Sequence, residues 1–257
     1  MIEPTDSPAT PPTQVLAFDN VTLGYGDFTV ISELSLAVNA GEVVAVMGGS
    51  GSGKTTLMRA ATGQIPVMQG ELKAFGQSMH RLKRRELEGL RQRMGVLFQH
   101  GALFTDLDVF ENVAFPLREH TRLSEDDIAH KVLHNLDAVG LRAAAHLKLS
   151  EVSGGMARRV ALARAIVREP ELVFYDEPFA GLDPISMGIA ARLIRHLSDK
   201  LGCASVVITH DVPESFEIAD KVYIVGQGKL KASGSPDSLR QSQDPYVKQF
   251  LDGAPDG

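Results

Sequence analysis

The spacing of apolar and polar positions defines three stretches of different character. From Val15 to Val46 apolar residues follow a strand-like pattern with two glycine-containing turns. From about Gln99 to Glu151 the apolar spacing becomes helical, and from Glu171 onward short apolar runs alternate with helical patterns. This order predicts an α/β core that is interrupted by a helical subdomain at about residues 100–160.

Residues typical of helix starts and helix ends predict the bounds of several helices. Ser124–Asp127 is typical of a capping box, and Gly140 is expected to end the helix that starts there. Asp183 followed by proline predicts the N-cap of another helix, and Ser235 followed by proline predicts the start of a final helix. In the last third of the chain, the apolar runs at 172–175 and 205–209 predict strands that are buried on both faces of a parallel sheet. Residues 221–233 predict a hairpin.

Composition is that of an ordinary globular protein. Of the 257 residues, 44% are hydrophobic and 23% are charged, and the formal net charge of −6 argues against a general nucleic-acid binder. No apolar run reaches the length that spans a bilayer, so a membrane role is expected to act through a partner. Residues 1–13 lack the order of a signal peptide and are expected to be disordered, with the protein in the cytoplasm. The single Cys203 is expected to be a small buried filler.

The most specific motif follows the apolar run at 42–47. Its glycines allow successive backbone N–H groups to turn inward around phosphates. In a loop of this spacing, Lys54 reaches the β- and γ-phosphates and the Thr55 hydroxyl ligates Mg²⁺. A helix expected from Thr55 to Thr62 directs its positive end at the nucleotide. The predicted nucleotide site consists of Gly48, Gly49, Ser50, Gly51, Ser52, Gly53, Lys54, Thr55 and Thr56.

Asp176 and Glu177 follow the buried strand predicted at 172–175. Carboxylates at the carboxyl end of a parallel strand lie where ligands bind in open α/β sheets. In a phosphate-loop protein, the first acid is expected to hold Mg²⁺, and the second to orient and deprotonate the attacking water.

A second anion site is predicted at Ser153-Gly154-Gly155. A serine N-cap and two glycines, followed by an amphipathic helix to Val167, leave unpaired N–H groups at a helix start. The alternative is an ordinary capped helix. The position of this segment ahead of Asp176 and Glu177, in a chain with a phosphate loop, favours the anion site.

In this order the motifs resemble the nucleotide-binding subunits of ABC transporters, over residues 15–250. The resemblance implies a P-loop NTPase core of the ABC ATPase type with an antiparallel β subdomain and the inserted helical subdomain. It implies one domain at 14–250 between tails at 1–13 and 251–257, and the hydrolysis of ATP with Mg²⁺. The resemblance implies that Glu177, His210 and Gln99 are catalytic and that the adenine stacks on Tyr25. It implies a metal site formed by Thr55, Gln99 and Asp176, and a D-loop that contains Asp183. It also implies a homodimer in which the signature residues of one chain act on the nucleotide of the other, namely Ser153, Gly154, Gly155 and Met156.

Four segments narrow the resemblance to the ATPases of the Mla phospholipid transport system, namely 99–106, 112–120, 153–159 and 183–188. It implies a peripheral ATPase on the cytoplasmic side of the inner membrane of a Gram-negative bacterium, driving phospholipid transport that maintains outer-membrane asymmetry. The implied partners are a second copy of the chain, an integral membrane permease of the MlaE type docked near residues 101–116, an MCE-domain protein of the MlaD type and a STAS-domain protein of the MlaB type, without nucleic acid.

Some positions depart from the family pattern. Gly49 stands where proline is common in this loop, and in the signature Met156 and Val152 stand where glutamine and leucine are usual. Two other functions are compatible with the motifs: an importer ATPase for a polar solute, and a soluble ABC protein acting on ribosomes or DNA. The second is disfavoured because such proteins usually carry two cassettes or long coiled-coil inserts. His130 and His134 lie at i and i+4 but lack a third ligand, so we interpret them as surface histidines.

Overall fold

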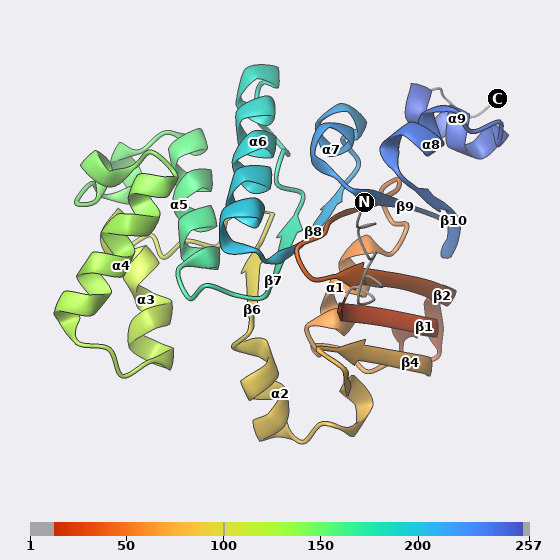
Figure 1. The fold of residues 1–257 in the computed structure, drawn as a ribbon, viewed down its shortest axis with the longest axis horizontal. Coiled ribbons are helices and arrows are strands. Elements are labelled where there is room, and N and C mark those ends of the chain that lie inside the picture. The colour runs from red at the N-terminus through yellow and green to blue at the C-terminus, as the bar shows by residue number, and fades with distance from the viewer. Residues whose placement is uncertain (1–12, 100, 254–257) are drawn as a thin grey trace, which may run out of the picture.

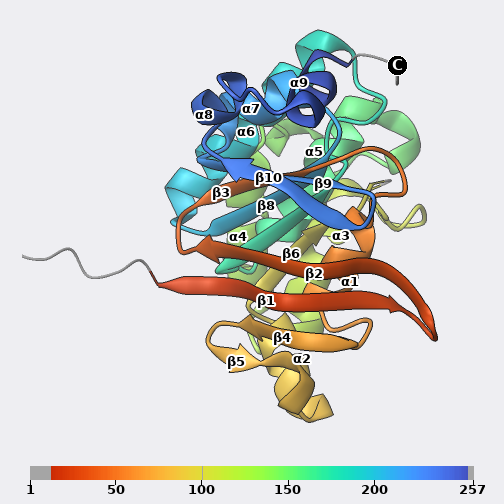
Figure 2. The same cartoon turned by 90° about the vertical axis from the view of Figure 1, so that its right-hand side faces the viewer.

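The computed structural model describes residues 13–99 and 101–253. Two β-sheets form the body of the molecule (Figure 1). The antiparallel sheet has the strand order β2-β1-β4-β5 and faces the viewer in Figure 2. It consists of β1 (Gln14–Tyr25), β2 (Phe28–Asn39), β4 (Gln69–Ala74) and β5 (Gln77–Ser78).

The larger sheet has the strand order β10-β9-β3-β8-β7-β6. Its strands are β3 (Val43–Met47), β6 (Met94–Leu97), β7 (Leu172–Asp176), β8 (Ala204–Thr209), β9 (Lys221–Gly226) and β10 (Lys229–Gly234). All neighbouring pairs are parallel except β9 and β10, which form the predicted hairpin. The carboxyl ends of β3 and β7 therefore lie at the same edge, on either side of β8, where parallel sheets bind ligands.

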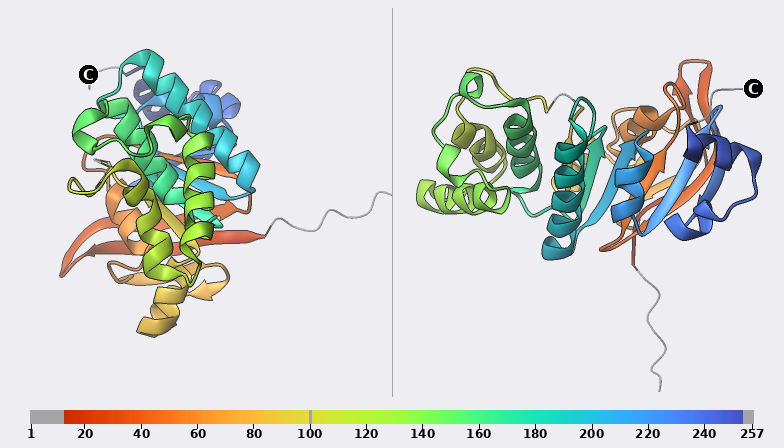
Figure 3. Two further views of the ribbon diagram at one scale, coloured as in Figure 1. Left: turned by 90° about the vertical axis from the view of Figure 1, so that its left-hand side faces the viewer. Right: turned by 90° about the horizontal axis from the view of Figure 1, so that it is seen from above.

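The helices lie around this sheet in separate groups. They are α1 (Lys54–Ala61), α2 (Arg84–Arg91), α3 (Val109–His120), α4 (Glu125–Ala138), α5 (Gly154–Ile166), α6 (Pro184–Leu201), α7 (Val212–Ile218), α8 (Pro236–Arg240) and α9 (Pro245–Asp252). Seen from above in Figure 3, α3, α4 and α5 form a helical end, and α8 and α9 lie at the opposite end. The helical insertion is thus present. The exact domain bounds taken from the sequence stay a prediction, and α9 continues two residues beyond the predicted bound at 250.

Buried apolar side chains pack against both faces of β3. Val44 and Val46 pack in the cluster that includes Leu57 of α1 and the antiparallel sheet. Ala45 and Met47 pack in a second cluster formed with α7, α8 and α9. Because successive side chains of a strand point to opposite faces, this packing fixes the end of β3, and with it the start of the following loop.

Two sequence expectations need correction. The segment after Ser235 forms two helices instead of one final helix. Asp244 caps the second helix by accepting from the N–H groups of Tyr246 and Val247, and Pro245 disfavours helical backbone at Asp244. Helix α5 ends at Ile166 and is not amphipathic: the four consecutive residues 160–163 are all buried, so apolar side chains surround its middle.

The expected tails fall largely outside the described residues. Residues 1–12 and 254–257 are not described, while Thr13 accepts a backbone hydrogen bond from Ala40 at 2.9 Å. Across residues 13–99 and 101–253, no helix combines the length and apolarity needed to cross a membrane. Cys203 is buried, as predicted, and carries a free thiol.

Candidate functional site

The predicted phosphate loop, residues 48–53, connects β3 to α1. Gly51 and Gly53 have φ angles of 75° and 100°, which favour glycine. A Cβ atom at Gly53 would also lie 2.6 Å from Cγ1 of Ile31, so glycine is needed there for space as well. At Gly49 the φ angle is ordinary, and a Cβ atom would meet no described atom within 4 Å. The conformation of the loop therefore requires glycine at 51 and 53 but not at 49.

Lys54 begins α1 and turns its ammonium group back into this loop. Its Nζ donates to the carbonyl oxygens of Gly48 at 2.6 Å and Gly49 at 3.0 Å, and lies 3.9 Å from Oε1 of Glu177. Burial lowers the pKa of Lys54, and the charges of Glu177 and Asp176 oppose that shift. A partly desolvated cation held by carbonyl groups at a helix N-terminus favours the entry of an anion.

Asp176 ends β7 with its carboxylate buried. Burial is the largest cause of the raised pKa of Asp176, followed by the charge of Glu177, while Lys54 lowers it. Within the part of the chain that the structure describes, Oδ1 of Asp176 and Oγ of Ser52 are buried without a hydrogen-bond partner. Burying an oxygen atom without a hydrogen bond costs folding free energy, and a bound cation would offset that cost. Mg²⁺ prefers oxygen ligands such as carboxylates, so the unpartnered oxygen of Asp176 fits the magnesium site predicted from the sequence.

Glu177 follows in a strained backbone conformation. Its φ angle is 47°, which costs about 1–2 kcal/mol for a residue with a side chain. Its backbone N–H donates to Ile208 at 2.7 Å, and its Oε2 lies 3.0 Å from Nδ1 of His210. Glu177, His210 and Asp211 form the cluster of potential metal-ligating side chains found among the described residues. Strain of this kind tends to occur at functional sites.

Lys54, Glu177 and His210 line one cleft of about 500 Å³ at the edge of the larger sheet, whereas Asp176 is outside the described residues that line it. Its volume lies in the range of small-molecule sites. The lining residues are Val30, Gly49, Ser50, Gly51, Ser52, Gly53, Lys54, Thr55, Thr56, Gln99, Glu177 and His210. We call this the nucleotide cleft.

Tyr25 stands outside the described residues that line the nucleotide cleft. Its hydroxyl accepts a hydrogen bond from Nη1 of Arg59 at 3.1 Å, and the residue is 44% exposed. The pKa of Tyr25 is lowered chiefly by its hydrogen bond with Thr56 and further by Arg59. Its ring is thus tethered to α1, beside the loop.

A second cleft of about 410 Å³ is lined by the predicted signature glycines, Gly154 and Gly155, and by Asp183 of the D-loop, whereas Ser153 and Met156 are outside its described lining. Ser153 caps α5 by accepting from the N–H of Met156 at 3.2 Å, and Asp183 caps α6 by accepting from Ile185 at 3.0 Å. The lining residues are Gln99, Gly101, Leu103, Gly154, Gly155, Ala157, Arg158, Ala180, Gly181, Leu182, Asp183 and Ser186. We call this the signature cleft. Gln99 lines both clefts, whereas Lys54 and the signature glycines lie in different ones.

Comparison with known proteins decides the family. A protein-family profile described as "ABC transporter" matches residues 31–180, which is more than half of the chain. The chain belongs to the ABC transporter family. An "Intermembrane phospholipid transport system ATP-binding protein MlaF" of Haemophilus influenzae is 52% identical over 93% of this chain and 90% of its own length.

Two solved structures of ABC proteins share the fold. The cbiO1 subunit from Clostridium perfringens, part of the cbiONQ ABC transporter complex, superimposes with a TM-score of 0.84 at 26% identity, covering 93% of this chain and 95% of its own. A dimeric post-hydrolysis state of the ATP-binding cassette MJ0796, bound to ADP and Pi, gives a TM-score of 0.77 at 27% identity, with 86% and 98% covered. The predicted fold class is therefore confirmed, and the chain is an ABC-type ATPase that binds nucleotide.

Within this ABC ATPase, the structure adds two residues that sequence reasoning missed. Val30 of β2 lines the nucleotide cleft, and no motif marks it because it arrives from the antiparallel sheet. Arg158 lines the signature cleft and contacts two backbone carbonyls, which no pattern of residue types reveals. His130 and His134 are exposed on α4, as interpreted from the sequence.

Proposed function

We propose that this chain is the ATP-hydrolysing subunit of an ABC transporter that moves phospholipid between the inner and outer membranes of a Gram-negative bacterium. The nucleotide cleft carries the ATPase part of the proposal, because Lys54, Glu177 and His210 converge on one phosphate loop. The cargo rests on the 52% identity to a relative whose name assigns intermembrane phospholipid transport to that protein.

ATP binds with its phosphates in the 48–53 loop. The loop N–H groups and the ammonium group of Lys54 bind the phosphate oxygens, and the N-terminus of α1 adds its partial positive charge. Thr55, Asp176 and Gln99 are the residues that would hold a Mg²⁺ ion. When bound, that ion neutralises charge on the phosphates. The ring of Tyr25, at the end of β1, is the surface on which the adenine stacks.

Glu177 acts on the attacking water as general base. Its Oε2 is held by His210 at 3.0 Å, so the carboxylate has a fixed orientation towards the loop that contains Lys54. Its left-handed backbone keeps the side chain in that place. His210 and Gln99 respond to the terminal phosphate, and catalysis is mainly positioning and charge stabilisation.

The working unit is a homodimer in which each nucleotide is bound by two chains. The signature glycines and the phosphate loop of one chain line separate clefts. The exposed N-terminus of α5, with Ser153, Gly154 and Gly155, is an anion-binding end that lies away from its own nucleotide cleft. A second copy in head-to-tail orientation supplies the phosphates that this end binds, and Asp183 of the D-loop lies at that interface.

The transporter partners bind the helical end. An integral permease of the MlaE type docks near residues 101–116, where Phe104 and Phe115 are 39% and 38% exposed with ring centroids 4.7 Å apart. Two exposed aromatic rings in contact are typical of a protein interface. An MCE-domain protein of the MlaD type and a STAS-domain protein of the MlaB type complete the complex, with the ATPase on the cytoplasmic side of the inner membrane.

Reconstitution tests this function directly. The chain is purified with its membrane partners, placed in phospholipid vesicles, and assayed for ATP hydrolysis and for ATP-dependent movement of a labelled phospholipid. The expected result is movement that requires ATP and is absent with Lys54→Ala. Hydrolysis stimulated by a polar solute, without lipid movement, would instead support the importer. Isolation with ribosomes or DNA would contradict the transporter assignment.

A further inference from the structure

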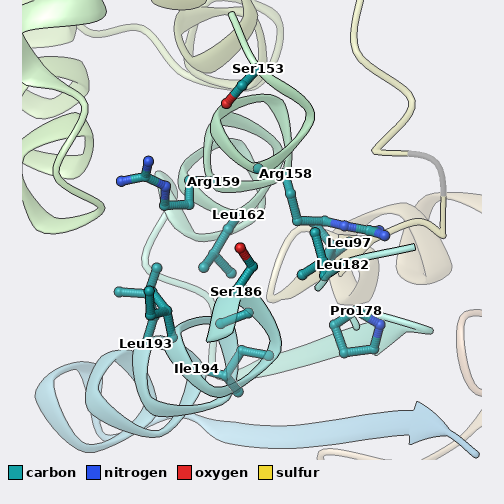
Figure 4. A pocket seen from close by; sticks show the side chains of 13 residues that line it. Leu97, Ser153, Arg158, Arg159, Leu162, Pro178, Leu182, Ser186, Leu193 and Ile194 are labelled. Atoms are coloured by element: carbon teal, nitrogen blue, oxygen red, sulfur yellow. The ribbon is translucent and has the colours of Figure 1, made fainter. Parts of the chain in front are cut away.

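Helix α5 carries two neighbouring arginines with different environments. A cavity of about 250 Å³ lies between α5 and α6, and both Arg158 and Arg159 line it. Figure 4 shows the two side chains leaving α5 in opposite directions, with Arg158 extending towards Leu97 and Leu182. Arg159 donates to the carbonyl of Val139 at the end of α4, inside the helical end. Arg158 points away from the helical end, towards the loops that follow β6 and β7.

The Arg158 guanidinium binds two loops at once. Its Nη1 donates to the backbone carbonyl of Gln99, in the loop after β6. Its Nη2 donates to the backbone carbonyl of Ala180 at 2.8 Å, in the loop after β7. Burial lowers the pKa of Arg158, and no acidic partner offsets that cost among the causes of the shift. A partly desolvated guanidinium that is satisfied by carbonyl oxygens alone fixes geometry, because those oxygens belong to the backbone.

Both loops carry residues of the proposed reaction. Gln99 itself lines both clefts. Ala180 lies three residues after Glu177, and its N–H donates to the Glu177 carbonyl at 3.3 Å, so a shift of Ala180 is transmitted to Glu177. Arg158 lies five residues after Ser153 on the signature helix. One side chain therefore joins the signature helix to the loops of Gln99 and Glu177.

Arg164 provides an internal comparison on the same helix. It donates to the carbonyls of Gly101 and Ala102, and thus holds the same loop as Arg158 further along. Within the described part of the chain, Arg164 makes no hydrogen bond to the loop after β7. Loss of Arg164 frees one loop, whereas loss of Arg158 frees both.

We propose that Arg158 is a positioning residue for ATP hydrolysis, which fixes Gln99 and Glu177 relative to the signature helix. This rests on the proposed function, because it assigns Arg158 to the site in which Glu177 activates water. Arg158 lies outside the set of residues that line the nucleotide cleft, so its loss leaves the phosphate-loop side of the ATP site in place. The loss acts on turnover, because small displacements of reacting groups reduce rate steeply.

The test compares four variants in the assembled complex: Arg158→Ala, Arg158→Lys, Arg164→Ala and Arg84→Gln. Arg84 is an exposed residue of α2 that pairs with Glu88, so its variant controls for the loss of one positive charge. For each variant kcat and KM for ATP, the affinity for a non-hydrolysable ATP analogue and the melting temperature are measured. Arg158→Ala is expected to lower kcat at least about tenfold with unchanged analogue affinity and melting temperature. Arg164→Ala is expected to lower it less, and Arg84→Gln not at all.

Arg158→Lys separates the double contact from simple charge. One ammonium group at the end of a flexible stem lacks the planar fork that reaches both carbonyls, so partial recovery is expected. Full recovery by lysine, or an unchanged kcat in Arg158→Ala, would overturn the proposal. Equal losses for Arg158→Ala and Arg164→Ala with a lowered melting temperature would do the same, since they indicate a general loss of packing. Lys54→Ala is measured alongside: if it retains turnover, the proposed function itself is wrong.

Discussion

The nucleotide cleft and the signature cleft differ in how completely one chain builds them. The nucleotide cleft has a buried cation, a strained Glu177 and glycines that backbone and space require. In the signature cleft, Gly154 and Gly155 face open space, with no described atom within 4 Å of a Cβ at either position. The first cleft is preorganised by its own chain. The second offers an uncovered helix end, which suits a surface that is completed by another molecule.

The largest expected effect breaks the nucleotide cleft itself. Lys54→Ala removes the buried positive charge that stabilises the carboxylates of Asp176 and Glu177. Nucleotide binding, hydrolysis and lipid movement are expected to be lost together, as measured by analogue binding, phosphate release and labelled-lipid transfer. Preserved lipid movement in this variant would contradict the coupling of transport to this cleft.

Glu177→Gln separates binding from chemistry in the same cleft. The amide keeps the size and one oxygen of the side chain but accepts no proton from water. Nucleotide affinity is expected to remain while turnover falls by about 10²–10⁴-fold, the usual contribution of a positioned general base. Glu169→Gln, at an exposed residue paired with Lys131, serves as control. Turnover close to that of the unaltered protein would remove Glu177 from its proposed role.

Ser153→Ala acts at the start of the signature helix α5, outside the nucleotide cleft. It removes the cap that accepts from Met156 and costs about 1 kcal/mol of folding free energy. Because the phosphate loop is untouched, a single chain is expected to bind nucleotide as before, while hydrolysis by the dimer falls. Denaturant unfolding and phosphate release measure the two parts. A loss of nucleotide binding in the isolated chain would show that the two clefts are not independent.

Asp176→Asn tests the cost of the uncompensated carboxylate, without nucleotide or metal. The pKa of Asp176 is raised in the folded chain, so the folded state binds the proton more tightly and ionisation costs stability. The variant is therefore expected to melt at a higher temperature than the unaltered chain at neutral pH. The difference should vanish at pH values below the usual range of aspartate, about 3.9, where both forms are neutral. A lower melting temperature at neutral pH would contradict the assigned burial cost.

The smallest effect is expected at Gly49. Its φ angle is ordinary and the space around it is open, so Gly49→Ala is expected to change stability by about +0.4–1 kcal/mol through the unfolded state. Gly53→Ala is the matched contrast, since it adds a Cβ against Ile31 at a φ angle of 100° and is expected to destabilise the chain. Denaturant midpoints measure both. Equal losses from the two substitutions would show that the loop restricts position 49 as tightly as position 53.

The difference between the clefts also explains what the sequence reveals. Residues that act by chemical type at fixed spacing, such as Lys54 and the Asp176–Glu177 pair, were found because local strand-to-loop geometry places them. Val30 and Arg158 were missed because their roles depend on which backbone segments from distant parts of the chain come near them. Strands β4 and β5 and helix α2 carry few buried residues, so periodicity gave little signal there. For α5 the amphipathic expectation failed because the helix is packed around its middle.

Complementation between two inactive variants tests most directly whether the sites are completed in trans. Lys54→Ala disables the nucleotide cleft, and Gly155→Asp places a negative charge at the open helix end while leaving the Ser153 cap in place. Mixed dimers, selected by two different affinity tags, contain one site with both lesions and one site with none. The account predicts that each variant alone is inactive and that the mixed dimer regains ATP hydrolysis. Mixed dimers that form but remain inactive would contradict it.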